Sequence, residues 1–266
     1  MKIIKTLGTL TLLFGSAIAS SSAVAGFSWT YTGNGTECPT GGCVEVDSDA
    51  GKTITSTATG WYSETTSGAA IQQARKLREW DGLGVEATSG DTSSPEHATD
   101  NNTWYDSVLF DFGGDSVELD QITMGWHTDS DFSLLRYTGN DTPTLAGNSY
   151  SDLTLTKGWE LISNYFCSCG GGSTGADMTF NVNAENKSSS YWLVAAINPS
   201  YYSDTRYIGN DHFKIKRLAG LYDAPPDTPP GTVPTPATWL LMLAGAAALT
   251  ASRRKGQKET ATALAA

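Results

Sequence analysis

Apolar residues along the chain come in short runs, and most of these runs lack the spacing of an amphipathic helix. In Phe213-Lys214-Ile215-Lys216 apolar residues alternate with lysines, and Leu153 and Leu155 lie on either side of a threonine. Alternation with a period of two is typical of a strand that buries one face. We predict strands over residues 108–110, 119–124, 132–137, 153–155, 178–182, 191–197 and 212–218.

Turn-forming residues separate these runs. Gly33-Asn34-Gly35, Gly113-Gly114 and Gly139-Asn140-Asp141 are examples, and glycines also fill residues 170–172. Such residues favour sharp reversals because they adopt backbone conformations that most residues avoid. Several short strands joined by tight turns indicate an all-β fold. We expect one jelly-roll-like β-sandwich over residues 26–222.

Residues 69–80 fit two different structures. A helix would place Ile71, Leu77 and Trp80 on one side, whereas a strand would place Leu77 and Trp80 on opposite sides. We favour the strand, because residues 80–85 continue the segment as strand and turn.

The first 25 residues have the layout of a secretory signal peptide. Lys2 and Lys5 precede an apolar stretch, and Ala23-Val24-Ala25 has small residues at the two positions that define a cleavage site. We predict cleavage after Ala25, which leaves Gly26 as the new N-terminus. An uncleaved N-terminal anchor is the alternative.

The C-terminal end combines a spacer, an apolar span and a basic cluster. Residues 223–236 hold six of the ten prolines, so we expect an extended spacer rather than a packed element. Residues 237–252 are uncharged, and Arg253-Arg254-Lys255 follows at once. This pattern predicts a single transmembrane helix, with a basic cytoplasmic tail at 253–266 and the sandwich outside the inner membrane.

The segment between these ends is strongly acidic. The whole chain has a formal net charge of −11, and residues 26–236 carry 11 Lys and Arg against 27 Asp and Glu. Such a field repels nucleic acid and anionic membranes, so we expect no nucleic-acid partner. It suits the binding of cations, or it keeps an exported protein soluble.

Four cysteines, Cys38, Cys43, Cys167 and Cys169, form two close pairs in the sequence. An exported chain meets an oxidising compartment, so we expect disulfides. Cys38 and Cys43 bracket a turn that allows local closure, whereas pairing Cys167 with Cys169 closes a strained ring. Cross-pairing of the two clusters therefore stays open, and the spacing disfavours a zinc site.

Carboxylates gather between the predicted strands. Asp100 and Asn101 share one tight loop, and Asp129 and Asp131 are two residues apart. Calcium takes roughly six to eight oxygen ligands from such groups, so these four residues are candidate ligands of Ca²⁺. The full spacing of an EF-hand is lacking. Solvated or turn-capping side chains are the alternative interpretation.

Tryptophans offer a second kind of binding surface. Trp61 and Trp104 border polar loops, and a tyrosine follows each of them. Indole rings that reach solvent can stack on sugar rings, so these two residues are candidate carbohydrate contacts. We assign Trp192 to the core, because it lies inside a predicted apolar strand.

Catalytic signals are weak. None of the three histidines lies in a zinc-protease motif, and no Gly-x-Ser-x-Gly sequence occurs. Glu96 with Asp100 could form the carboxylate pair of a secreted glycoside hydrolase, but an acidic chain offers many such pairs. We therefore expect a protein that is not an enzyme.

Val233-Pro234-Thr235-Pro236, the apolar span and Arg253-Arg254-Lys255 together resemble the PEP-CTERM sorting signal of Gram-negative bacteria. The resemblance implies that an exosortase, a membrane protease-transpeptidase, recognises and cleaves this end. Thr235 stands where the name-giving motif has glutamate, and 11 residues follow Lys255. A plain single-pass anchor is the alternative.

Residues 80–140 resemble exosortase-dependent surface proteins, chiefly at Leu83-Gly84-Val85, residues 95–101, Leu109-Phe110-Asp111-Phe112 and Gly125-Trp126. The resemblance implies transient residence in the inner membrane, final location at the cell surface or outside the cell, and a link to exopolysaccharide or biofilm. We thus predict an exported, non-enzymatic surface or matrix protein whose partners are an exosortase and an exopolysaccharide. A calcium-dependent carbohydrate-binding module is the alternative.

Overall fold

The computed structural model describes residues 26–223, apart from residues 67, 92–96, 168, 170–175, 205, 207 and 208. Within this part of the chain the secondary structure is almost entirely β, and the strand pairs are antiparallel. Two sheets pack against each other around a shared core, so the fold is a β-sandwich, as the strand pattern predicts.

In the described residues, sheet A has nine strands and sheet B has seven. Sheet A contains β1 (Gly26–Thr30), β2 (Asn34–Glu37), β6 (Lys76–Trp80), β7 (Leu83–Glu86), β8 (Thr99–Asp100), β10 (Val117–Asp129), β13 (Met178–Asn181), β14 (Ser188–Ser189) and β16 (His212–Tyr222). Sheet B contains β3 (Cys43–Asp49), β4 (Lys52–Glu64), β5 (Gln72–Gln73), β9 (Trp104–Asp111), β11 (Phe132–Tyr137), β12 (Trp159–Tyr165) and β15 (Tyr191–Ala196).

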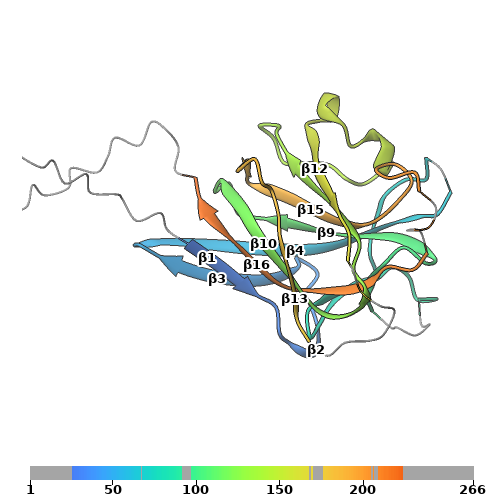
Figure 1. The fold of residues 1–266 in the computed structure, drawn as a ribbon, viewed down its shortest axis with the longest axis horizontal. Coiled ribbons are helices and arrows are strands. Elements are labelled where there is room, and N and C mark those ends of the chain that lie inside the picture. The colour runs from blue at the N-terminus through green and yellow to red at the C-terminus, as the bar shows by residue number, and fades with distance from the viewer. Residues whose placement is uncertain are drawn as a thin grey trace, which may run out of the picture. The chain divides into compact units, whose positions relative to one another are not determined.

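Hydrogen-bonded neighbours follow the order β13-β10-β16-β7-β6-β2 in sheet A and β12-β11-β15-β9-β4-β3 in sheet B. The short strands β1 and β8 also pair with β16, β14 pairs with β10, and β5 pairs with β4. Figure 1 shows β10 and β16 of sheet A side by side, with β9, β15 and β12 of sheet B in the other layer.

The main core lies between the sheets, where alternate residues of each strand point inward. Ile122 on β10, Phe110 on β9 and Trp192 on β15 are fully buried in it, so Trp192 is a core residue as predicted. The indole N–H of Trp29 on β1 donates to the carbonyl of Ile54 on β4 at 3.1 Å, which ties sheet A to sheet B. Burying each such side chain stabilises the fold by about 1.5–3 kcal/mol.

Sheet B is covered on its outer face as well. Leu109, Leu135 and Leu193 point to that face and pack with Tyr150 and Trp159 in a second apolar cluster. Two short 3₁₀ turns, η1 (Tyr150–Asp152) and η2 (Leu155–Lys157), lie in the segment that provides part of this cover. Because β9, β11 and β15 are buried on both faces, they carry continuous apolar runs rather than an alternation.

The predicted strand at 153–155 is wrong. Leu153 follows η1 and is buried in the second cluster, whereas Leu155 begins η2 and is 68% exposed. Asp152 accepts hydrogen bonds from the backbone N–H and the hydroxyl of Ser149, at 2.8 and 2.7 Å, so the chain closes into a turn here. A short alternation cannot distinguish such a turn from a strand.

Residues 69–80 contain strands, as favoured above, and β6 continues into β7 through a tight hairpin at Asp81-Gly82. Leu77 is buried and Trp80 is 64% exposed, which places them on opposite faces. The φ angles of Asp81 and Gly82 are 53° and 118°, the positive values that two-residue hairpin loops require.

The cysteines form two local disulfides, Cys38–Cys43 and Cys167–Cys169. The alternative of cross-pairing between the two clusters is therefore not realised, and no sulfur is left to bind zinc. Their Cα atoms lie 4.9 and 5.1 Å apart, within the usual range for a disulfide. Cys38 follows β2 and Cys43 begins β3, so the first disulfide joins the two sheets at one edge.

Several predicted segments lie outside the described residues: Ala23 and Ala25 of the cleavage site, the spacer, the motif at 233–236, the span at 237–252 and the basic tail. Among the residues that the structure does describe, no helix is long and apolar enough to cross a membrane. The described strands run from Gly26 to Tyr222.

Gly125→Ala tests the packing of the β6–β7 hairpin. A Cβ at Gly125 would overlap the carbonyl oxygen of Asp81 at the hairpin tip, so we expect a loss of about 1–3 kcal/mol in the free energy of unfolding by urea. Gly90→Ala is the matched control, since its Cβ would meet only the Thr88 hydroxyl at 3.6 Å. Equal losses in the two variants would contradict the close approach.

Candidate cation site

Three aspartates meet at one end of the sandwich. Asp129 ends β10 and Asp131 lies in the turn to β11, while Asp211 immediately precedes β16. Asp129 is opposite His212 in the pairing of β10 with β16, which places the turn after β10 beside the start of β16. One carboxylate oxygen from each aspartate lies within 4.8 Å of the other two. We call these three residues the aspartate trio.

The trio is largely buried and incompletely hydrogen-bonded. Asp211 is 0% exposed, Asp131 is 1% exposed and Asp129 is half-buried. Oδ1 of Asp211 and Oδ1 of Asp129 have no hydrogen-bond partner among the described residues. Buried polar atoms nearly always have a partner, because an unpaired one costs about 1–3 kcal/mol and more when it is charged. The two oxygens are therefore available to bind a proton, a water molecule or a cation.

Asn101 holds Asp211 in place. Its Nδ2 donates to Oδ2 of Asp211 at 2.6 Å, and its Oδ1 accepts from the backbone N–H of Asp211 at 3.0 Å. The N–H of Ile197, just after β15, donates to the same Oδ2 at 2.9 Å. These bonds fix one carboxylate oxygen of Asp211 and leave the other free to face the trio.

The other two members are also anchored through one oxygen. Oδ1 of Asp131 accepts from the N–H of Cys167 at 2.5 Å, and Oδ2 of Asp129 accepts from Nδ2 of Asn210 at 2.7 Å. The residues that hold the trio thus come from the ends of β8, β12 and β15 and from the segment before β16. The cluster is a built feature of this end of the sandwich rather than a chance meeting of surface side chains.

Full ionisation of the trio is costly. Two unit charges 4.8 Å apart repel by about 3 kcal/mol at an effective dielectric constant of about 20. Burial, followed by the charge of Asp131, raises the pKa of Asp211 to about 9. Burial also raises the pKa of Asp131 to about 6. At neutral pH the trio needs either bound protons or a bound cation.

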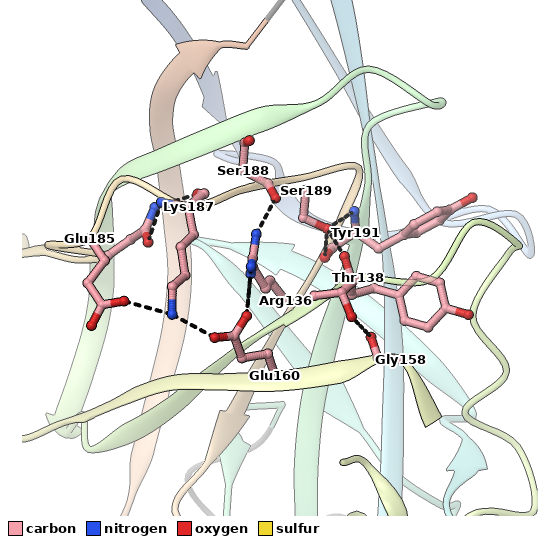
Figure 2. Close-up of polar contacts among 11 residues, drawn as sticks. Arg136, Thr138, Gly158, Glu160, Glu185, Lys187, Ser188, Ser189 and Tyr191 are labelled. Atoms are coloured by element: carbon pink, nitrogen blue, oxygen red, sulfur yellow. Dashed lines mark hydrogen bonds and ion pairs between the residues drawn. The ribbon is translucent and has the colours of Figure 1, made fainter. Parts of the chain in front are cut away.

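Glu160 on β12 is a carboxylate with cationic partners, and its pKa shifts in the opposite direction to those of the trio. Glu160 contacts Nε of Arg136 at 2.7 Å and Nζ of Lys187 at 2.6 Å, and Lys187 also reaches Glu185 (Figure 2). The hydrogen bond from Lys187 is the main reason that the pKa of Glu160 is lowered. By contrast, none of the described lysines or arginines forms an ion pair with the trio.

Asp100 and Asp106 form a second buried pair. Asp106 lies inside β9, is 1% exposed and has no partner for Oδ1 among the described residues, while its Oδ2 accepts the N–H of Asp100 at 3.4 Å. Burial, followed by the charges of Asp100 and Asp91, raises the pKa of Asp106 well above its usual range. Burial raises the pKa of Asp100 to about 7, so this pair holds a proton at neutral pH.

Carboxylates supported by amide oxygens are the donors that hard cations prefer. Ca²⁺ accepts roughly six to eight oxygen ligands in an irregular shell, whereas Mg²⁺ demands near-octahedral geometry. The sulfur atoms of Cys167 and Cys169 lie near Asp129 but are bonded to each other, so they supply no thiolate. The donor set therefore fits calcium better than zinc.

The structure brings together two of the four predicted calcium ligands, Asp129 and Asp131. Asp100 belongs instead to the second buried pair, and Asn101 uses its amide to hold Asp211. Sequence reasoning misses Asp211, because a single aspartate before a strand looks like an ordinary turn residue. The preceding Gly-Asn dipeptide is its only signal in the sequence.

The two predicted carbohydrate contacts lie on neighbouring strands of sheet B, with Trp61 on β4 and Trp104 on β9. Both are half-buried. The indole N–H of Trp61 donates to the hydroxyl of Thr59 at 3.0 Å, and the ring of Trp104 meets that of Tyr62 edge-on at 6.5 Å. Both rings thus have packing partners, and carbohydrate contact at these residues stays a prediction.

No protein-family model matches this chain, and no curated protein matches it. Inferences about its function therefore rest on its own residues.

Asp106→Asn should change how stability depends on pH. In the wild type, the stabilisation from protonated Asp106 is fully present below the unfolded-state pKa of about 3.9 and is lost as the pH rises towards the raised folded-state pKa. Asparagine has nearly the same shape as aspartic acid, but its side chain does not titrate in this pH range. Urea unfolding at about pH 5, 6 and 7 should show the wild type losing about 1.4 kcal/mol per pH unit relative to the variant. Parallel profiles would contradict a protonated Asp106.

Proposed function

We propose that this chain is an exported, non-enzymatic surface or extracellular-matrix protein whose β-sandwich is completed by a bound calcium ion. The convergence of Asp129, Asp131 and Asp211 carries this proposal. A cation between them would neutralise charges that no described lysine or arginine neutralises. It would also join the turn after β10 to the start of β16, which closes this end of the sandwich.

The terminal segments of the sequence support the export part of the proposal. A signal peptide at 1–25 would deliver the chain across the inner membrane, and the motif at 233–236 with its apolar span would hold it there until an exosortase cleaves it. An exopolysaccharide or biofilm matrix is the proposed destination. A jelly-roll-like type of sandwich is part of this proposal, supported by the alternation of β8, β9, β10 and β11 between the two sheets.

Burial supports a non-enzymatic role. Asp106, Asp131 and Asp211 are each at most 1% exposed. A glycoside hydrolase needs two carboxylates that reach a glycosidic bond from opposite sides, at about 5–9.5 Å from each other. Glu96, the partner considered for Asp100, lies outside the described residues. Buried aspartates are better suited to holding an ion than to attacking a polymer.

Calcium should stabilise the protein through the trio. At a free concentration about 100-fold above the Kd, bound Ca²⁺ adds about 2.7 kcal/mol, which raises the Tm by about 5–10 °C for a domain of this size. Asp211→Asn should abolish this shift while leaving the Tm in EDTA equal to or above that of the wild type, because asparagine is neutral and needs neither a bound proton nor a cation. Calorimetry with CaCl₂ and with EDTA measures both values.

Asp141→Asn is the matched control for this experiment, because Asp141 is exposed and lies outside the trio. It should keep the full calcium shift. A Tm that does not respond to Ca²⁺ in the wild type, or a shift that persists in Asp211→Asn, would refute the calcium site.

Mass spectrometry tests the processing. In cells with an active exosortase, the mature protein should begin at Gly26 and end upstream of Arg254. In cells without the exosortase, the same protein should retain its C-terminal end. A mature form that extends beyond Arg254 in the first strain would refute cleavage at this signal, whatever the result for calcium.

A further inference from the structure

We propose that Trp80, Trp126 and Lys214 form a binding site for an anionic saccharide, such as a uronic acid unit of a polysaccharide. The three residues come from β6, β10 and β16 of sheet A. Phe213 and Ile215 point into the core between the sheets, so Lys214 lies on the outer face of sheet A. We call this site the indole platform. It names a ligand class that the proposed function leaves open, and it does not depend on the calcium ion.

The β6–β7 hairpin brings Trp80 to the other two residues. Gly82 lies so close to β16 that a Cβ would be 2.9 Å from the carbonyl carbon of Lys214. The carbonyl of Asp81 accepts the N–H of Trp126 at 3.2 Å, where Gly125 leaves room for it. Backbone contacts therefore position the platform, so its geometry does not depend on the side chains that would meet a ligand.

Lys214 lies between the two indole rings. Its Nζ is 5.3 Å from the ring centroid of Trp80 and 5.7 Å from that of Trp126, within range of cation–π attraction. Lys214 is only 7% exposed. No ion pair or hydrogen bond joins Lys214 to another described side chain, and the nearby Asp81 pairs with Lys216 at 2.9 Å. Burial lowers the pKa of Lys214, and the charge of Asp81 opposes this shift.

Lys52 also contacts an aromatic ring but, unlike Lys214, it forms an ion pair with a carboxylate. Nζ of Lys52 lies 4.9 Å from the ring centroid of Tyr222, and it also forms an ion pair with Asp115 at 2.6 Å. Both lysines contact aromatic rings, but only Lys52 has a carboxylate. A carboxylate brought by a ligand would complete the surroundings of Lys214 in the same way.

The exposed ring of Trp80 indicates what the rest of the ligand is. Trp80 is 64% exposed, and the ammonium group of Lys214 lies beside its ring. The C–H face of a pyranose ring is apolar and packs flat on an indole, while a uronic acid carries one carboxylate at the edge of that ring. An anionic membrane is a poorer match, since one lysine contributes only about 1 kcal/mol there.

Calorimetric titration of the full chain with a short oligogalacturonate tests the platform, with a neutral cello-oligosaccharide as comparison. Lys214→Met and Trp80→Ala should each weaken binding of the oligogalacturonate about ten-fold or more. Lys214→Arg keeps the positive charge but changes its shape, so it should bind the oligogalacturonate more tightly than Lys214→Met does. Raising the salt from about 0.05 M to about 0.5 M should weaken wild-type binding.

Lys52→Met is the matched control, and it should bind like the wild type. Because Trp80 is exposed, Trp80→Ala keeps the test valid even where Lys214→Met fails to fold, and thermal melting checks both. No binding of oligogalacturonate by the wild type, or equal affinity in Trp80→Ala, would overturn the proposal. So would binding to anionic vesicles through these residues without binding to the uronate.

The same titration with Asp211→Asn separates this proposal from the calcium site. Retained saccharide binding in a variant that no longer responds to calcium supports an independent platform. Loss of saccharide binding in a folded Asp211→Asn protein would overturn its independence.

Discussion

Along the pairing of β10 with β16, core residues such as Ile122 and Leu218 face each other across sheet A, and most other strands of that sheet attach to one of these two. In the described residues, only β6 and β2 reach the pair through another strand, β7. The register shifts between His127 and Asp129, at the end where the aspartates gather. Both candidate sites therefore depend on one strand pair being formed correctly.

The two candidate sites carry opposite charges, although both involve residues on or next to β10 and β16. The trio would take a cation, and Lys214 would take an anion. Asp129 comes three residues after Trp126, and Lys214 comes three residues after Asp211. Among the described residues, no lysine or arginine forms an ion pair with the aspartates and no carboxylate forms one with Lys214. Lys214 lies on the outer face of the sheet, whereas the aspartates lie at the strand ends. Binding of the two proposed ligands would neutralise each site separately without rearranging the fold.

Much of the sandwich could be predicted because its strands carry a direct signal. The runs around Phe110, Ile122 and Leu134 have the apolar composition that a buried strand needs, and all three residues lie in strands. The turn at Leu153 could not be predicted, since its pattern depends on the outer face of sheet B, which only the tertiary fold creates. Asp211 could not be recognised for the same reason. Its importance comes from Asp129 and Asp131, about 80 residues away in the chain.

The position of β16 has a consequence for how the chain folds. The last strand of the sandwich lies between β10 and β7 and also pairs with β1, the first strand, through Gly26 opposite Leu221. Sheet A therefore cannot assemble until the chain is available as far as Tyr222. Sheet B does not depend on β16, because the last of its strands, β15, ends at Ala196, whereas sheet A gains a central strand only at the end of the domain, so distant contacts dominate its folding. A chain exported N-terminus first would therefore complete sheet A only after its final strand had crossed the membrane.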